Sequence, residues 1–250
     1  MTGADSGFLA GRVAIVTGGS RGIGLATAEA LRAEGADVLV CGRSRSVLDE
    51  ARSRIEASPG GGRVAAVAAD VRRHDEAERL VAAAVDELGR LDVLVNNAGV
   101  GRFAPIGDLS VDAWLETIET NLSGVFYCCR AAVPVMKGNG GGWIVNVSSL
   151  AGKHPFAGGV AYCTSKAGLN ALTESLMQDV RGDGIRVSCV LPGSVNTEFG
   201  GGRPSPDMDW KLAAPDVARA VVDLLRHPAR SLPSRVELRP STPRKQPGSR

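Results

Sequence analysis

Residues 17–24 read Thr-Gly-Gly-Ser-Arg-Gly-Ile-Gly, and this stretch decides the fold. It follows an apolar run at 12–17 that predicts a buried strand, and it precedes an Ala-rich run at 22–34 that predicts a helix. Glycine lets the backbone approach a ligand closely, and the start of a helix offers free N–H groups with a partial positive charge. A strand, a glycine-rich turn and a helix in this order are typical of a pyrophosphate-binding site.

The same alternation continues along the chain. Further strands are predicted at 37–41, 63–68, 91–95, 143–147, 185–191 and 235–238, and helices at 45–57, 75–88, 111–137, 162–181 and 215–226. The strands are continuous apolar runs, which is typical of parallel sheets buried on both faces. The pattern predicts an α/β fold, with residues 1–239 forming a single-domain Rossmann-like doubly wound parallel sheet of about seven strands and helices on both faces. Residues 240–250 are rich in Pro, Ser and Arg and are expected to be a disordered tail.

Composition excludes several classes of protein. The net charge of +2 is too small to predict nucleic-acid binding. No apolar run reaches the roughly 18 residues of a membrane helix, and the N-terminus lacks the pattern of a secretory signal, so a soluble cytoplasmic protein is expected. Five cysteines without a CxxC pair and three scattered histidines predict no metal site. The adjacent Cys128 and Cys129 are interpreted as small buried residues on a helix.

Further motifs follow the glycine turn in a fixed order. They are Asp70-Val71 after the third strand, Asn96-Asn97-Ala98-Gly99 after the fourth, Ser149 after the fifth, Tyr162-x-x-x-Lys166 in the next helix, and Pro192-Gly193 after the sixth strand. With the GxxxGxG spacing at 18–24, this set resembles the short-chain dehydrogenase/reductase family over about residues 8–240. The overall similarity points towards 3-oxoacyl-acyl-carrier-protein reductases and related carbonyl reductases.

The end of the second strand bears on the choice of cofactor. It reads Cys-Gly-Arg-Ser-Arg at 41–45 and lacks the carboxylate that holds the ribose 2′-OH in NAD-preferring folds. Arg43, and Arg21 in the glycine loop, are suited to a 2′-phosphate because the arginine donor fork is planar and always charged. The alternative is that both are solvated surface arginines. NADP(H) is therefore predicted over NAD(H).

Tyr162 and Lys166 lie four residues apart on a predicted helix and so share a face. A tyrosine pKa near 10 is too high for easy proton transfer, and a neighbouring ammonium together with the oxidised nicotinamide is expected to lower it. The family resemblance implies that Tyr162 is the general acid and base, and that Lys166 also binds the nicotinamide ribose hydroxyls. The alternative is ordinary packing beside a lysine whose charge reaches solvent.

Two polar residues complete the candidate catalytic set. Ser149 follows the fifth strand, and its hydroxyl can donate to a substrate carbonyl oxygen; Ser148 is chemically equivalent, but the family spacing to Tyr162 favours Ser149. Asn121 is unfavourable inside a helix, which predicts a local distortion. The resemblance implies that Asn121 holds a water linking Lys166 to solvent. The alternatives are a capping serine and an asparagine bonded to a neighbouring backbone group.

Other cofactor contacts follow from position in the family pattern. The glycine loop contributes Gly18, Ser20, Arg21, Gly22, Ile23 and Gly24. Asp70 and Val71 are expected beside the adenine, while Asn97, Ala98 and Gly99 are expected to line the cofactor through backbone atoms. Pro192, Gly193, Val195 and Thr197 follow the sixth strand, and the last two are expected at the nicotinamide amide.

The substrate walls are expected from 101–106, 150–159 and the segment after Thr197. Apolar candidates in these segments are Phe103, Leu150, Phe156, Phe199, Met208 and Trp210. Many family members carry small helices over the substrate, whereas 198–214 is short and rich in Gly and Pro. This difference predicts an open or mobile rim.

The leading function is therefore NADPH-dependent reduction of a ketone, such as a 3-oxoacyl thioester, to a secondary alcohol. One alternative is oxidation of a sugar, polyol or steroid alcohol. Another is a non-catalytic dinucleotide sensor, which would not need the set of Ser149, Tyr162 and Lys166. The resemblance further implies a homotetramer or homodimer built through the helices at 111–137 and 162–181.

Overall fold

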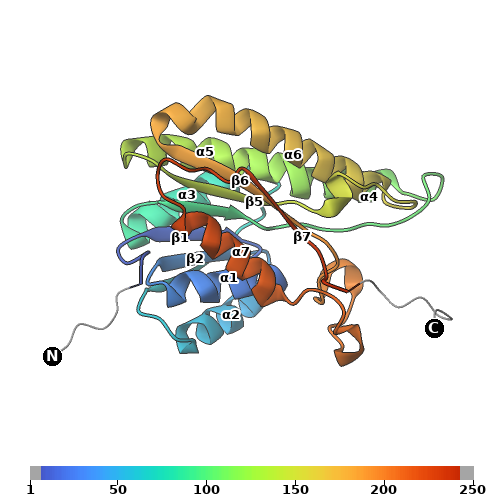
Figure 1. The fold of residues 1–250 in the computed structure, drawn as a ribbon, viewed down its shortest axis with the longest axis horizontal. Coiled ribbons are helices and arrows are strands. Elements are labelled where there is room, and N and C mark those ends of the chain that lie inside the picture. Colours follow the sequence, from blue (N-terminus) through green and yellow to red (C-terminus); the bar gives the residue numbers. More distant parts are fainter. Residues whose placement is uncertain (1–6, 243–250) are drawn as a thin grey trace.

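The computed structural model describes residues 7–242. Its seven strands form one parallel sheet in the order β3-β2-β1-β4-β5-β6-β7, covered by helices on both faces (Figure 1). The strands are β1 Val13–Thr17, β2 Asp37–Gly42, β3 Val64–Ala68, β4 Val93–Asn96, β5 Gly142–Val147, β6 Ile185–Pro192 and β7 Arg235–Leu238. The predicted doubly wound sheet is confirmed. Most of the predicted tail, 243–250, lies outside the described residues.

The helices also match their predicted places. They are α1 Gly22–Ala33, α2 Arg45–Ala57, α3 His74–Leu88, α4 Val111–Ile118, α5 Gly124–Gly138, α6 Val160–Val180 and α7 Ala214–Arg226. The long helical region predicted over 111–137 is confirmed, and a π-helical turn at Glu119–Ser123 divides it into α4 and α5. The local distortion predicted at Asn121 is found in this turn.

Strand β1 shows how the sheet divides the core into two layers. Val13 and Ile15 belong to one buried cluster, whereas the alternating Ala14 and Val16 belong to the other. This alternation follows from the period of two in a strand, and both faces are apolar because both are covered. Strand β7 differs, since it lies at the sheet edge and its residues are half-buried or exposed.

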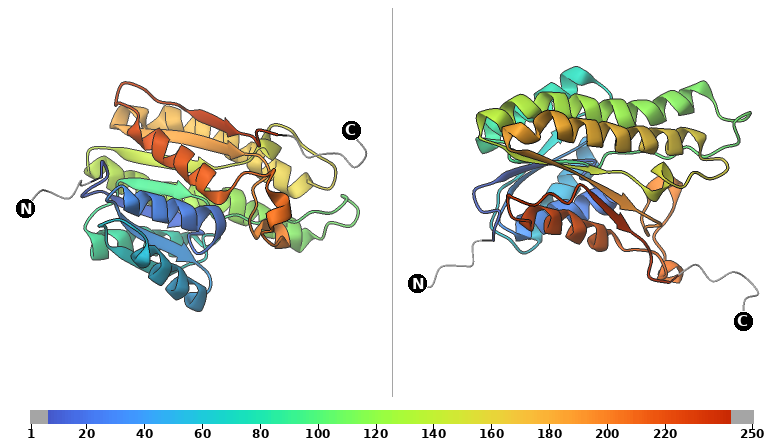
Figure 2. Two further views of the ribbon diagram at one scale, coloured as in Figure 1. Left: turned by 60° about the horizontal axis from the view of Figure 1, so that its bottom comes forward. Right: turned by 45° about the horizontal axis from the view of Figure 1, so that its top comes forward.

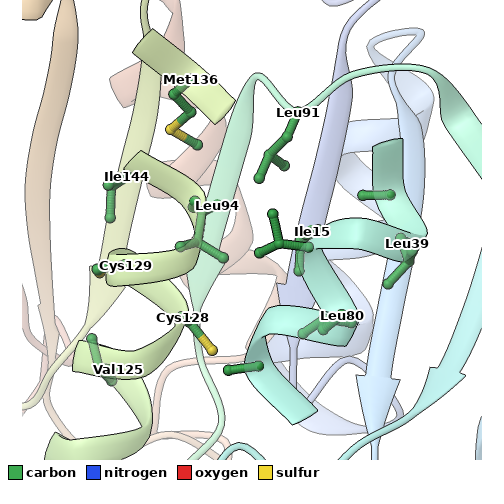
Figure 3. Close-up of a cluster of buried hydrophobic side chains, with 14 of the residues drawn as sticks. Ile15, Leu39, Leu80, Leu91, Leu94, Val125, Cys128, Cys129, Met136 and Ile144 are labelled. Carbon is green, nitrogen blue, oxygen red and sulfur yellow. The ribbon is translucent and has the colours of Figure 1, made fainter. Parts of the chain in front are cut away.

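Each cluster is completed by three helices. Those of the first cluster are α3, α5 and α6, which contribute Leu80, Met136 and Leu169 (Figure 3). Those of the second are α1, α2 and α7, which contribute Leu31, Leu48 and Val221. Figure 2 shows these two helical layers on opposite faces of the sheet.

The cysteines behave as small core residues. All five are free and buried, and Cys128 and Cys129 lie on α5 in the first cluster, as interpreted from the sequence (Figure 3). Within residues 7–242, no three His, Cys, Asp or Glu side chains come together in a way that could hold a metal ion. In the same part of the chain, no helix is long and apolar enough to cross a membrane.

A buried carboxylate, Asp92, links the starts of three strands. It accepts hydrogen bonds from Arg12 Nη1 (2.8 Å), from Arg90 Nη2 (2.7 Å) and from the Val13 N–H (2.9 Å). Its own backbone bonds to Val13 of β1 and to Trp143 of β5. Burial alone raises the pKa of Asp92, but the hydrogen bonds from Arg90, Val13 and Arg12 outweigh it and hold the pKa below its ordinary value.

We expect Asp92→Asn to lower the free energy of unfolding by about 2–3 kcal/mol, because it removes charge-assisted hydrogen bonds from a buried site. A carboxyl with a lowered folded pKa contributes stability that is complete above its unfolded pKa of about 3.9 and is lost as pH falls through the folded pKa. The variant should therefore also flatten the acid side of the stability curve, measured by urea unfolding at several pH values.

Asp49→Asn, which breaks an exposed pair with Arg45 on α2, is the control and should cost less than about 0.5 kcal/mol. Equal loss in both variants would contradict this account.

Candidate active site

The predicted site residues gather where the strands end. Strands β1 and β4 are neighbours in the sheet. From β1 the strand order continues through β2 to β3, whereas from β4 it continues in the opposite direction through β5 and β6 to β7. Such a reversal leaves a crevice at the carboxyl ends of the strands, where α/β proteins bind ligands. The glycine loop follows β1, the segment 97–99 follows β4, and Ser149 and Pro192 lie at the ends of β5 and β6.

The glycine loop has the conformation of an anion-binding turn. Gly18 and Gly22 have φ of 62° and 54°, in the left-handed region that favours glycine. A Cβ on Gly24 would lie 2.3 Å from the carbonyl oxygen of Gly18, so the turn is too tight for a side chain there. Arg21 precedes α1 in an extended conformation, and within the described chain no side chain caps this helix. Its first N–H groups are therefore available to a phosphate.

Hydrogen bonds fix the glycine loop to the end of β4. Thr17 Oγ1 accepts from the backbone N–H groups of Asn97 and Ala98, both at 3.0 Å. Asn97 Nδ2 returns hydrogen bonds to the carbonyl oxygens of Thr17 (3.0 Å) and Gly18 (3.2 Å). The Asn97 side chain is thus used for structure, which leaves its backbone for the predicted ligand contact. Sequence reasoning did not single out Thr17, although a polar residue ending a buried apolar strand is a signal for such a role.

Thr197 lies next to the glycine loop. A Cβ on Gly22 would lie 3.5 Å from Thr197 Cβ, which is an ordinary contact distance. Val195 pairs with Leu212 in an isolated bridge and packs on the second core cluster. Gly193 donates to the carbonyl oxygen of Leu238 on β7 (2.8 Å), which places the segment after β6 along the same edge.

Arg43, at the end of β2, lies in a charged group that the sequence did not predict. Its Nη1 is 3.8 Å from Glu116 on α4, and Arg102 lies 2.8 Å from the same carboxylate. The hydrogen bond from Arg102 is the main reason why the pKa of Glu116 is lowered. Ser20 lies nearby, because its Oγ is 3.5 Å from the place of a Cβ on Gly42. Arg43 remains more than half exposed, so its guanidinium is open to a ligand.

Asp70 and Val71, at the end of β3, are held by different neighbours. Asp70 accepts hydrogen bonds from Arg72 Nε at 2.9 and 3.0 Å, and these lower the pKa of its carboxyl. Val71 is buried, and its Cγ2 is 2.9 Å from the place of a Cβ on Gly124 at the start of α5. The Asp70 carboxylate is therefore already paired with a cation of this chain.

Lys166 is the most unusual side chain at the site. It is 4% exposed, and within residues 7–242 its Nζ makes one hydrogen bond, to the carbonyl oxygen of Val147 at the end of β5 (2.8 Å). Burial lowers its pKa to about 8. An ammonium has three donors, so two remain for other oxygens. The Nζ lies 5.9 Å from the centre of the Tyr162 ring and 3.8 Å from the place of a Cβ on Gly99.

The phenol of Tyr162 has a raised pKa in the chain alone. Burial raises the pKa, and a hydrogen bond with Ser149 lowers it by less than burial raises it. The Lys166 ammonium lies 5.9 Å from the centre of the Tyr162 ring. The lowering expected from Lys166 together with the oxidised nicotinamide concerns the dinucleotide-bound protein and stays a prediction.

The two serines are distinguished by their partners. Ser149 starts the 3₁₀ turn Leu150–Gly152, its Oγ accepts from the Ala151 N–H (3.1 Å), and its hydroxyl also interacts with Tyr162. Ser148 Oγ instead donates to the backbone oxygen of Lys166 (3.2 Å). This difference supports the choice of Ser149 over Ser148.

Asn121 is buried in the π-helical turn, and its side chain is fully engaged. Its Oδ1 accepts from the Val100 N–H (2.8 Å), and its Nδ2 donates to the Val100 carbonyl oxygen (2.9 Å) and to Ser165 Oγ (3.0 Å). These bonds join the loop after β4 to α6. The Asn121 side chain therefore bonds backbone groups, as the alternative interpretation predicted. A water relay at this position would have to use the backbone of the π-helical turn.

The rim at 198–214 contains two single 3₁₀ turns, Phe199–Gly201 and Pro206–Met208, and Gly200 in the first has a left-handed φ of 69°. The predicted open or mobile rim stays a prediction. Asn196 fixes the rim, since its Nδ2 donates to the Ser205 carbonyl oxygen (2.9 Å) and its Oδ1 accepts from the Ser205 N–H (3.2 Å). Of the predicted wall residues, Phe103 and Phe199 lie against Tyr162, and Phe156 lies against Phe103.

Comparison with known proteins agrees with this geometry. The profile of the short chain dehydrogenase family matches residues 12–206. The chain belongs to this family of oxidoreductases, as its glycine spacing and its Tyr162 and Lys166 motif indicated.

Two relatives illustrate the range of the family. An uncharacterised oxidoreductase of Staphylococcus saprophyticus is 33% identical over 233 residues, covering 92% of this chain and 97% of the relative. A 3-oxoacyl-[acyl-carrier-protein] reductase of Synechocystis is 38% identical over 192 residues, covering 76% and 77% of the two chains.

Similar solved structures include proteins crystallised with a dinucleotide. An alcohol dehydrogenase from the archaeon Thermococcus sibiricus, complexed with 5-hydroxy-NADP, has a TM-score of 0.86 at 30% identity and covers 94% of this chain and 99% of its own. A metagenomic short-chain oxidoreductase in complex with NADP has a TM-score of 0.82 at 37% identity with the same coverage.

The pKa of Tyr162 can be measured directly, because the chain has two tyrosines. We expect the difference in ultraviolet phenolate absorbance between the wild type and Tyr162→Phe to appear only above pH 10 in the protein without dinucleotide. Burial of the phenol is the reason. A phenolate that forms below pH 10 would show that a neighbouring charge outweighs burial.

Proposed function

We propose that the chain catalyses the NADP(H)-dependent reduction of a ketone to a secondary alcohol, with Tyr162 as the general acid. The observation that carries the proposal is the buried ammonium of Lys166, which lies under Tyr162 with two donors to spare. A buried cation that is only partly hydrogen-bonded is costly, and its presence at the end of β5 is explained by a ligand that supplies oxygen acceptors. Ribose hydroxyls are such acceptors.

The rest of the crevice fits a nicotinamide dinucleotide. The uncapped N-terminus of α1 offers N–H groups to the pyrophosphate. Gly22, at the start of that helix, lies next to Thr197 of the segment after β6. We assign Asp70 and Val71, which follow β3, to the adenine, and the backbone of 97–99, which follows β4, to the same dinucleotide. The dinucleotides named in the two similar structures support the same assignment.

Bound NADPH would supply a hydride to the carbonyl carbon of the substrate. Ser149 donates a hydrogen bond to the carbonyl oxygen, and Tyr162 gives that oxygen its proton as the alcohol forms. The phenolate that remains is stabilised by the Lys166 ammonium below it, and it regains a proton from solvent. Asn121 acts as a positioning residue in this scheme, because it holds the loop at Val100 against α6, which carries both Tyr162 and Lys166.

The finer assignments follow from the neighbours of the crevice. Arg43, with Arg21 and Ser20 from the glycine loop, is proposed to bind the 2′-phosphate of NADP(H). A 3-oxoacyl thioester is a candidate substrate, in line with the name of the Synechocystis relative. A homotetramer or homodimer built through α4, α5 and α6 is proposed as the assembly.

We expect Tyr162→Phe to lower kcat for ketone reduction by about 100- to 10,000-fold while NADPH still binds, because the variant loses only the proton donor. The assay follows the loss of nicotinamide absorbance with a panel of ketones that includes an acetoacetyl thioester. Tyr127→Phe is the control and should keep full activity. Full activity in purified Tyr162→Phe would overturn the assignment.

Arg43 tests the cofactor preference. We expect Arg43→Ala to lower kcat/KM with NADPH by about tenfold or more and to leave kcat/KM with NADH unchanged, since charge-assisted hydrogen bonds to the 2′-phosphate are lost. Arg52→Ala, which breaks a pair with Glu56 on α2, is the control and should change neither value. A wild-type enzyme that prefers NADH would refute the assignment.

A further inference from the structure

Two of the five phenylalanines of the chain lie against Tyr162, and a third lies against one of these two. The Phe103 ring meets the Tyr162 ring edge-on, with centroids 5.6 Å apart and an interplanar angle of 70°. The Phe199 ring lies 5.5 Å from the Tyr162 ring at 52°. Phe156 lies 5.9 Å from Phe103 at 41°. We call Phe103, Phe156 and Phe199 the aromatic clamp.

The clamp is built from three separate segments. Phe103 follows β4, Phe156 precedes α6, and Phe199 begins a 3₁₀ helix of the rim. Glycines make room for the rings, because a Cβ on Gly101 would lie 2.7 Å from Phe103 and 2.8 Å from Phe199, and a Cβ on Gly159 would lie 2.8 Å from Phe156. Chain segments far apart in the sequence thus place two rings against Tyr162 and a third ring against Phe103.

The rings are open to solvent rather than packed in the core. Their residues are 48%, 49% and 44% exposed for Phe103, Phe156 and Phe199. Exposed aromatic rings gathered on one spot of a protein usually mark a binding surface. Here two of the rings lie against Tyr162, the residue proposed to protonate the substrate, so a group next to the substrate carbonyl would lie close to them.

A cavity of about 510 Å³ adjoins the clamp. Phe103 and Gly200 border it, together with Arg102 and the start of α4. Phe103 therefore touches both Tyr162 and the cavity. The volume is that of a small-molecule site, and it offers room for the remainder of a substrate whose ring lies in the clamp.

We infer that the aromatic clamp selects aryl ketones, in which an aromatic ring is attached directly to the carbonyl carbon. This inference rests on the proposed function and names its substrate class. Aromatic rings attract one another in edge-to-face and offset arrangements, because the face of each ring is negative and its edge positive. A saturated ring of equal size or a linear acyl chain gains apolar burial at the clamp but not this attraction.

The test compares acetophenone with cyclohexyl methyl ketone, which has a saturated ring of similar size. We expect the ratio of their kcat/KM values to fall about three- to tenfold in both Phe103→Leu and Phe199→Leu. Phe103→Tyr keeps the aromatic ring and should keep the ratio. Phe8→Leu is the matched control, because Phe8 is equally exposed at 44% but lies against Arg226, away from the site. NADPH binding, followed by nicotinamide fluorescence, should be unchanged in all variants.

Two results would contradict the inference, and they have different meanings. If the wild type reduces ketones but the ratio is the same in both leucine variants, the clamp does not select aryl groups and the proposed function stands. If the wild type reduces no ketone with NADPH, the proposed function fails and the inference fails with it.

Discussion

The buried ammonium of Lys166 is the constraint on which the site depends. Within the described chain the ammonium makes one hydrogen bond, which goes to Val147, the last residue of β5. The backbone oxygen of Lys166 accepts a hydrogen bond from Ser148, which follows the same strand. Helix α6 is therefore fixed against the sheet at the turn that carries Tyr162. Gly99 lies close to Nζ, because a Cβ there would lie 3.8 Å from it. A cation held in this way remains stable only if an oxygen-rich partner completes its shell or if its pKa falls, and its pKa does fall to about 8.

The hydrogen bonds around this lysine join the ends of several strands into one framework. Thr17 ties the glycine loop to β4, and Asn121 ties the loop after β4 to α6. The π-helical turn is what allows Asn121 to do so, because it turns a polar side chain inward in the middle of an otherwise amphipathic region. Groups from β1, β4, β5 and α6 are thus set in place by the protein itself, which is the preorganisation that catalysis requires.

The fold could be predicted almost fully from the sequence, because buried parallel strands are continuous apolar runs and their alternation with helices allows few arrangements. The motif residues could be placed at the strand ends for the same reason. The charged pair of Arg43 with Glu116 and the contacts of Thr17 could not be predicted, since they join residues far apart in the chain. The raised pKa of Tyr162 in the chain alone could not be predicted, because burial, which exceeds the effect of neighbouring polar groups, depends on how much protein surrounds the phenol. The two hydrogen bonds of Asn196 with Ser205, which fix part of the rim at 198–214, could not be predicted from its glycines and prolines.

The most direct test is the affinity for NADPH on either side of pH 8 in the wild type and in Lys166→Met. An ammonium that donates to ligand hydroxyls binds best when it is charged, so wild-type affinity should weaken as pH rises through about 8. Lys166→Met should bind NADPH about tenfold more weakly than the wild type below pH 8, and its affinity should not depend on pH in this range. Lys137→Met, which removes an exposed ion pair with Asp183, is the control and should bind NADPH as the wild type does. Equal affinity of Lys166→Met and the wild type at every pH would contradict the claim that Lys166 holds the dinucleotide.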